Sequence, residues 1–126
     1  MSGDRRTNAP PAALSLAGFH ILLALSGGEQ HGYGIMREVT SLTGGAMRLG
    51  PGTLYRTIKG LLAGDLISQA PARADPALDE ERRRYYRLTN SGWAAAEAEA
   101  ERLASLVRMA RARRLVAADG PADGST

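Results

Sequence analysis

The sequence predicts a mainly α-helical fold with one small β-hairpin and a long terminal helix. Apolar residues recur at helical spacing in three stretches of the first half of the chain. Two short stretches of strand character then flank a loop rich in Pro, Ala and charge. The last stretch begins acidic and ends basic, which suits the dipole of a long helix. This order is the plan of a winged helix-turn-helix domain with an added C-terminal helix.

Composition narrows the classes of function. The 126 residues suffice for one domain with a modest core, and 16 Lys and Arg against 13 Asp and Glu give a net charge of +3. This charge permits nucleic-acid binding without proving it. The chain has no Cys and 2 His, which is a poor set for a metal site. No arrangement of Ser, His and Asp stands out, so we expect no enzyme activity, no cofactor and no metal.

No segment is typical of a membrane protein or a secreted protein. The apolar run over residues 19–25 is interrupted by His20 and is far too short to span a bilayer. Residues 1–7 carry charges with no apolar run behind them, so no signal peptide is visible. We expect a cytoplasmic protein. His20 is expected to be a core or interface residue, and His31 to satisfy a local backbone group.

The helices of the first half begin and end at recognisable signals. After a flexible arm over residues 1–13, helices are expected over residues 14–26 and 33–42, each followed by a glycine pair. Residues 47–49 are expected to form a very short strand. A third helix is expected over residues 51–63, because Gly is acceptable at the N-cap and Pro is favoured at the first helical position. Its core-facing stripe is Leu54, Ile58, Leu61 and Leu62.

The hairpin and the final helix complete the fold. Strands are expected over residues 66–70 and 82–88, and Thr89 or Asn90 is expected to cap a helix that ends near residue 116. Three parts then follow the arm: a winged helix-turn-helix domain over 14–90, the final helix over 91–116, and a disordered tail over 117–126.

The third helix has a polar side opposite its core stripe. On a helical wheel Arg56 and Lys59 lie there, with Tyr55 on the flank. Arg can donate two hydrogen bonds to a guanine edge and Lys can neutralise phosphate. A glycine inside a helix costs about 1 kcal/mol relative to Ala, and close approach to DNA is one reason to keep Gly60. The alternative, that both cations merely solvate an exposed face, stays open from this helix alone.

The returning strand of the hairpin is unusually basic. Four cations lie around Tyr85 and Tyr86, and a basic hairpin beside a basic helix can grip backbone phosphates. Strand alternation sends Tyr86 and Leu88 to one side, which we expect to be the core. Helix and hairpin together make DNA reading the favoured interpretation. The expected DNA contacts are Gly52, Thr53, Tyr55, Arg56, Lys59, Arg82, Arg83 and Arg84.

Four motifs, in this order and spacing, resemble the PadR family of bacterial transcriptional regulators. They are His31-Gly32-Tyr33-Gly34-Ile35, Gly52-Thr53-Leu54-Tyr55, Asp65-Leu66-Ile67, and Arg83-Arg84-Tyr85-Tyr86-Arg87-Leu88-Thr89 with Gly92. The resemblance covers about residues 15–115. It implies a homodimeric winged-helix regulator, usually a repressor, with Tyr55 and its neighbours on the DNA-reading helix and residues 66–88 in the wing. Many relatives carry an acidic residue at the place of Leu62 and Gly at the place of Asp65, so we expect this helix to end differently.

The final helix predicts dimerisation independently of the resemblance. Its apolar residues follow 3-4 spacing, and no later element is available to cover them. An intramolecular lid is the alternative. Trp93 either fills core or lines an apolar pocket for a small aromatic effector between the helices of a dimer. The expected dimer contacts are Leu16, Phe19, Trp93, Ala96, Ala100, Leu103, Val107 and Ala110.

Together these features predict a homodimeric repressor whose partners are a pseudo-palindromic double-stranded DNA operator, a second copy of the chain and a possible aromatic effector. The alternative is a winged-helix adaptor that binds other proteins and reads no DNA. DNA binding through several cations weakens steeply as salt rises, so salt dependence separates the two.

Overall fold

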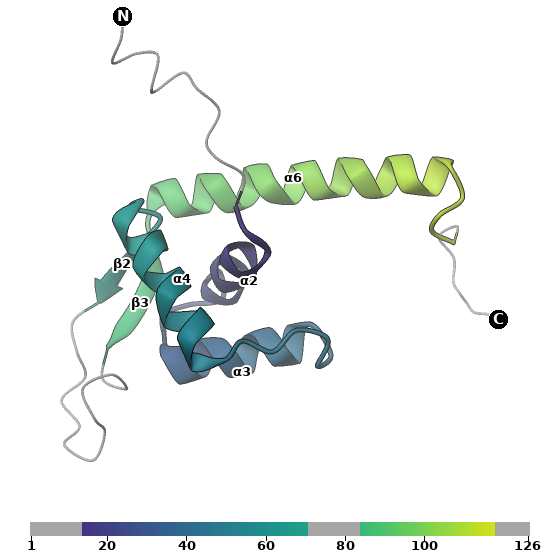
Figure 1. The fold of residues 1–126 in the computed structure, drawn as a ribbon. Helices are drawn as coiled ribbons and strands as arrows, with labels where there is room; N and C mark the ends of the chain where they lie inside the picture. The colour runs from purple at the N-terminus through teal and green to yellow at the C-terminus, as the bar shows by residue number, and fades with distance from the viewer. Residues whose placement is uncertain (1–13, 71–83, 118–126) are drawn as a thin grey trace, which may run out of the picture.

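The computed structural model describes residues 14–70 and 84–117, so the predicted arm, the loop over 71–81, Arg82, Arg83 and residues 118–126 lie outside it. Figure 1 shows a helical body with a small sheet on one side, and the last helix passing over the first and extending beyond the body. This arrangement confirms the predicted winged helix-turn-helix fold with a long C-terminal helix. In chain order the elements are α2 (Leu16–Leu25), β1 (Gln30–His31), α3 (Gly32–Leu42), α4 (Pro51–Ala63), β2 (Ile67–Ala70), β3 (Tyr85–Leu88) and α6 (Asn90–Ala112).

One hydrophobic core joins the helices to the sheet. At its centre Ile21 and Leu22 of α2 are fully buried. The predicted stripe of α4 faces this core, with Leu62 only partly buried. Burial of one fully covered aliphatic side chain contributes about 1.5–3 kcal/mol, so this cluster dominates the stability of the domain. Its other large, fully buried members are Ile35, Val39, Leu54, Ile58 and Ile67.

The sheet has three antiparallel strands in the order β1-β3-β2. In the hairpin Ile67 pairs with Leu88 and Ala70 with Tyr85. Tyr86 is buried and Leu88 partly buried, which confirms the predicted inner side of β3. The predicted strand over residues 47–49 is wrong, and the third strand lies instead at Gln30–His31. A two-residue strand carries too little pattern to be recognised before its partner β3 is in place.

The helix ends differ from the predicted ones by a few residues. α2 begins at Leu16, after the cap Ser15, and α3 begins at Gly32. Thr89 is the N-cap of α6, and the helix ends at Ala112 rather than near residue 116. In the described part of the chain, no helix is long and apolar enough to cross a membrane.

The end of α4 shows how the chain accommodates Asp65 where many relatives carry Gly. Gly64 has an ordinary negative φ of −87°, whereas Asp65 adopts a left-handed φ of 64°. The N–H of Asp65 donates to the carbonyl of Leu62, and the N–H of Leu66 donates to that of Leu61, each at 3.0 Å. These two bonds form a Schellman motif. Asp65 therefore occupies the left-handed position that glycine normally fills.

Replacing that residue should stabilise the protein. We expect Asp65→Gly to raise the free energy of unfolding by about 1 kcal/mol, because glycine adopts positive φ without the steric cost of a Cβ. Urea denaturation followed by circular dichroism measures the change. Gly64→Ala is the matched control and should not reproduce the gain through this mechanism. A lower denaturation midpoint for Asp65→Gly would show that the aspartate side chain itself holds the turn.

Candidate nucleic-acid interface

The outer side of α4 presents the cations that the sequence predicted. Arg56 and Lys59 are both exposed, and Gly52 and Thr53 at the start of the helix are exposed as well. An Nη of Arg56 lies 3.4 Å from Thr53 Oγ1, a long contact that leaves the guanidinium at the surface. Because the opposite side of α4 is buried in the core, the side with Arg56 and Lys59 faces outward.

Two glycines, Gly52 and Gly60, leave the same helix without a side chain at two exposed positions. A Cβ built on Gly52 or on Gly60 would meet nothing within 4 Å. Contacts among the described residues therefore do not require glycine at either place. A reason for glycine at Gly60 has to come from outside these contacts, and close approach of another molecule supplies one.

Tyr55 lies differently from its neighbours. Its ring packs against the core and its hydroxyl oxygen is buried, so the hydroxyl that we expected beside the two cations is turned inward. A Cβ on Gly32 would lie 2.2 Å from this oxygen. Because Gly32 has no side chain, the ring of Tyr55 on α4 can pack against the beginning of α3.

The predicted His31-Gly32-Tyr33-Gly34 motif makes the transition from strand to helix. Nδ1 of His31 accepts the N–H of Gly34 at 2.9 Å and caps α3, as expected for a histidine that satisfies a local backbone group. A Cβ on Gly34 would lie 2.5 Å from Oε1 of Gln30, so glycine makes room for that side chain. The motif therefore orients α3, on which α4 rests.

The wing contributes a cation beside those of α4. Lys59 and Arg84 line one hollow of about 210 Å³, whose floor includes Ile58 and Tyr86. A cation from α4 and a cation from the wing thus line the same hollow. Arg87 is engaged within the fold, since it lies 3.7 Å from a carboxylate oxygen of Glu29. Of the three wing arginines that we expected to contact DNA, the structure describes Arg84.

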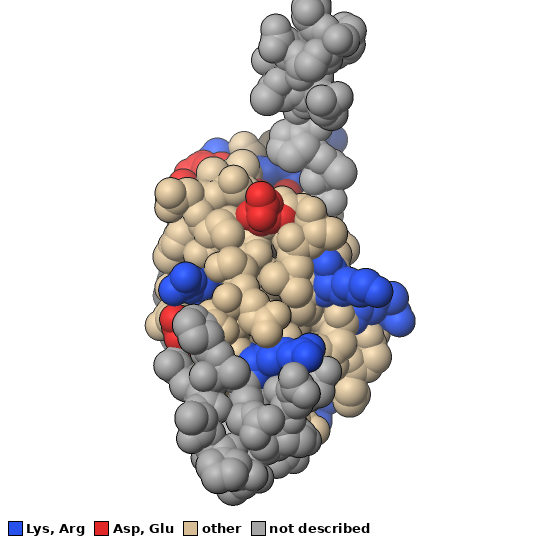
Figure 2. Space-filling view, turned by 90° about the vertical axis from the view of Figure 1, so that its left-hand side faces the viewer, with Lys and Arg blue, Asp and Glu red and all other residues tan. Residues whose placement is uncertain are grey.

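In the described residues before α4, two exposed arginines were not among the expected contacts. Arg48 lies in the turn before α4, and Arg37 lies on α3. The position of Arg48, two residues before the cap Gly50, was the signal available in the sequence. Figure 2 shows the side of the molecule that carries the sheet, where separate groups of Lys and Arg lie to the left, to the right and below, and an acidic group lies in the upper middle.

The expected dimer contacts fall into two groups. The exposed ones include Leu16 at 64%, Trp93 at 45% and Val107 at 43% relative exposure, together with Ala100. The others are half-buried: Phe19, Ala96, Leu103 and Ala110. Of these residues, Ala96 packs against the core, whereas Trp93, Ala100 and Val107 form an open edge of α6. Trp93 is half open, which does not fit the alternative that it simply fills core.

An acidic residue on α6 escaped prediction. Glu99 is buried, and its Oε1 accepts the Nε–H of Arg102 at 3.0 Å. The hydrogen bond from Arg102 lowers the pKa of Glu99 below its ordinary value, and the same bond raises that of Arg102.

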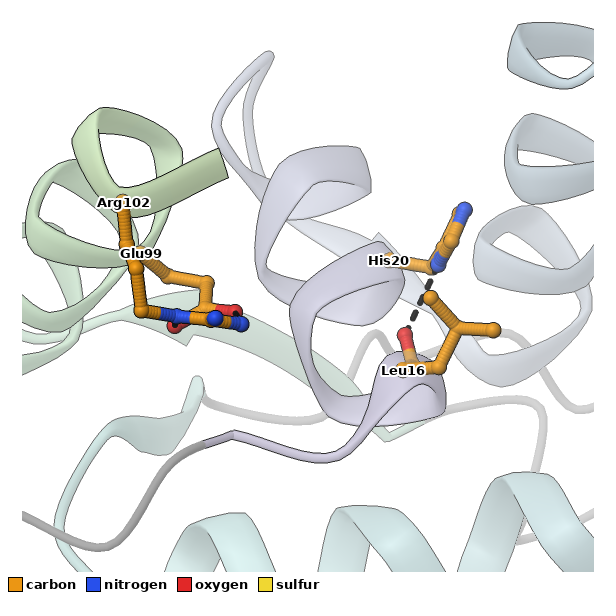
Figure 3. A network of polar contacts seen from close by, with 4 residues as sticks. All are labelled: Leu16, His20, Glu99 and Arg102. Atoms are coloured by element: carbon orange, nitrogen blue, oxygen red, sulfur yellow. Dashed lines mark hydrogen bonds and ion pairs between the residues drawn. The ribbon is translucent and has the colours of Figure 1, made fainter. Parts of the chain in front are cut away.

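Figure 3 places this pair on one side of α2 and His20 on the other, where His20 Nδ1 donates to the carbonyl of Leu16 at 2.7 Å.

Comparisons with known proteins agree with this geometry. The profile of the transcriptional regulator PadR-like family matches residues 21–98. A transcriptional regulator from Clostridium thermocellum superposes with a TM-score of 0.64 at 22% identity, covering 88% of this chain and 94% of that one. A PadR family transcription regulator from Clostridium difficile superposes with a TM-score of 0.64 at 23% identity, covering 77% and 96%.

A third similar structure concerns regulation. BpsR from Bordetella bronchiseptica, described with the mechanism by which 6-hydroxynicotinic acid regulates its DNA binding, superposes with a TM-score of 0.60 at 20% identity. The alignment covers 85% of this chain and 72% of that one. No curated protein sequence matches the chain at a significant level.

Proposed function

Because this chain belongs to the PadR-like family of transcriptional regulators, we propose that it is a homodimeric repressor that binds a pseudo-palindromic operator. The observation that carries the proposal is the outer side of α4, where exposed Arg56 and Lys59 lie next to a hollow shared with Arg84 of the wing. A helix held by its apolar side and exposed on its basic side fits the major groove.

Each of these cations has a distinct task in the proposal. Arg56 is the candidate for base reading, since its guanidinium can donate two parallel hydrogen bonds to guanine. Lys59 and Arg84 face one hollow and are candidates for the phosphates that border it. Phosphate contacts position the protein, while the arginine contact discriminates bases by about 1–3 kcal/mol. Arg82 and Arg83 extend the phosphate contacts along the wing in this proposal.

A second copy of the chain completes the proposed DNA-binding unit. The open edge of α6 exposes Trp93, Ala100 and Val107, and Leu16 on α2 is exposed as well. A two-fold dimer through these surfaces would present two copies of α4 to successive major grooves, about 34–36 Å apart. The pseudo-palindromic form of the operator follows from that symmetry.

A charge on the open edge of α6 should separate the two copies. We expect Val107→Asp to convert the dimer to monomer at micromolar concentration while the fold stays intact, because Val107 is exposed in the single chain and would be desolvated only in the dimer. Analytical ultracentrifugation measures the change. Ala98→Asp adds the same charge on the opposite side of the helical wheel and should leave the dimer unchanged. A monomeric wild type would contradict the proposed dimer.

We include release by a small aromatic effector in the proposal. Half-exposed Trp93 lies on the open edge of α6, where a dimer would enclose its ring. The regulation of BpsR by 6-hydroxynicotinic acid supports an aromatic class of effector. Aromatic carboxylic acids should quench the fluorescence of Trp93, the sole tryptophan, and weaken operator binding. No response to a broad panel of such acids would remove the effector from the proposal.

Salt dependence tests DNA reading against the adaptor alternative. DNA bound to the protein in its host is sequenced first, and the affinity for the recovered site is then measured by fluorescence anisotropy. With six or more phosphate contacts per dimer, affinity should fall about 10³-fold between about 50 mM and 200 mM salt. Recovery of no preferred site, or an affinity that salt does not change, would favour the protein-binding adaptor.

A further inference from the structure

A single hydroxyl group connects the end of α4 to the beginning of α6. Oγ1 of Thr89 donates to the carbonyl oxygen of Asp65 at 2.6 Å and accepts the N–H of Gly92 at 2.9 Å. The N–H of Thr89 donates to the carbonyl of Leu66 at 3.1 Å. Asp65 and Leu66 form the turn that ends the reading helix, and Gly92 lies in the first turn of the helix proposed for dimerisation.

Direct backbone contact accompanies these hydrogen bonds. A Cβ on Gly92 would lie 1.9 Å from the carbonyl oxygen of Leu66, so the first turn of α6 lies directly against the turn after α4. The left-handed φ of Asp65 is part of the same turn. The two helices are thus connected by the short Thr89 side chain and by direct backbone contact, and these contacts leave little room for movement.

We infer that Thr89 is a positioning residue that sets the angle between α4 and α6, and through it the operator half-site spacing that the dimer accepts. The inference rests on the proposed function, because spacing has a meaning only for a dimer that reads two half-sites. Thr89 itself lies at the junction, and the inference requires no contact between Thr89 and DNA. Its proposed effect passes through the carbonyl of Asp65 to the end of α4.

The length of α6 converts a small change of angle into a measurable one. A helix of 23 residues is about 34 Å long, so a rotation of about 10° at its first turn moves its far end by about 6 Å. Successive base pairs are about 3.4 Å apart, so this displacement corresponds to one or two base pairs of spacing.

Packing of α6 on the body limits the effect of losing the Thr89 hydroxyl. Ala95, Ala96 and Glu99 lie on the side of α6 that packs on the body, and α6 contacts α2 there. Without the Thr89 bond, α6 stays attached to the body but gains angular freedom. The expected result is therefore a broader tolerance for spacing and not a loss of binding.

The experiment separates the two bonds of Thr89. Thr89→Asp retains an acceptor for the N–H of Gly92, since Asp is a favoured N-cap, but has no proton to donate to Asp65 when ionised. Full-length variants are bound to palindromes of the recovered site whose half-sites are moved apart or together in single base-pair steps. A single half-site measures binding without the spacing requirement.

The wild type should prefer one spacing, and Thr89→Asp should reduce that preference by about fivefold, the change that corresponds to one hydrogen bond. Affinity for the single half-site should stay the same. Thr89→Ser, which keeps the hydroxyl, should restore the preference. Ser15→Ala is the matched control, because Ser15 Oγ caps α2 through an equally long 2.9 Å bond to the N–H of Gly18 and takes no part in the hydrogen bonds that join Thr89 to Asp65, Leu66 and Gly92.

Each remaining outcome decides a different question. A wild type that binds no spaced palindrome better than a half-site would overturn the proposed function. A wild type with a spacing preference that a folded, dimeric Thr89→Asp retains would overturn the inference alone. So would equal losses for all spacings and for the half-site, which indicate a merely structural role. If Thr89→Asp does not fold, Thr89→Ala compared with Ser15→Ala gives the same decision.

Discussion

The double variant Arg56→Ala/Lys59→Ala should lose operator binding while it keeps its fold. Both side chains lie on the exposed side of α4, opposite the buried Leu54 and Ile58. Removal of one base contact and one phosphate contact from each half of a dimer should weaken binding by about 10³-fold or more. A gel-shift assay on the recovered operator measures the loss, and circular dichroism checks the fold.

A matched variant separates loss of contacts from loss of charge. Arg108→Ala/Arg113→Ala removes the same net charge from exposed positions in the last turns of α6 and at its C-cap, at the end of the helix that extends away from α4 (Figure 1). At about 0.1 M salt this control should weaken binding only slightly, since charges beyond a Debye length of about 10 Å are then screened. Unchanged affinity of Arg56→Ala/Lys59→Ala would show that α4 does not read DNA.

The largest effect on stability is expected at Gly92. Gly92→Ala would place a Cβ 1.9 Å from the carbonyl oxygen of Leu66, and backbone atoms rather than a flexible side chain would have to move. We expect the free energy of unfolding to fall by about 3 kcal/mol or more, because overpacking against backbone also breaks the Thr89 bonds of this junction. Urea denaturation measures the change, and failure to accumulate as folded protein agrees with the same cause.

Gly60→Ala is the opposite case in the same chain. A Cβ on Gly60 meets nothing within 4 Å, so alanine should add about 1 kcal/mol of helix stability. If Gly92→Ala and Gly60→Ala had equal free energies of unfolding, the close contact between Gly92 and Leu66 would not contribute to the stability of the protein. Weaker operator binding by the stabilised Gly60→Ala would support close approach of DNA at this glycine.

Glycines illustrate where sequence patterns stop being informative. Gly32, Gly60 and Gly92 are the same residue type in the sequence, and only their neighbours tell them apart. Gly32 makes room for the Tyr55 hydroxyl, Gly92 lies against a carbonyl, and Gly60 has open space. Helical periodicity places each residue on its own helix, but it contains no information on which residue of a distant segment lies opposite.

The candidate site divides in the same way. The wheel of α4 correctly placed Arg56 and Lys59 outside and Leu54 inside, because 3.6-residue periodicity is a property of a single segment. The inward hydroxyl of Tyr55, by contrast, depends on α3. Likewise, Lys59 and Arg84 share a hollow only because β3 packs beside α4.

By itself, the sequence determined the order of the helices and the hairpin, the bounds of α4, the core side of β3 and the basic character of the outer side of α4. These are local properties, set by periodicity, by glycine and proline, and by alternation along a strand. Only the tertiary structure decided the third strand at Gln30–His31, the burial of Glu99 and the junction of Thr89 with Asp65. Those features come from contacts between segments distant in the chain, and such contacts exist only once the core has brought the segments together.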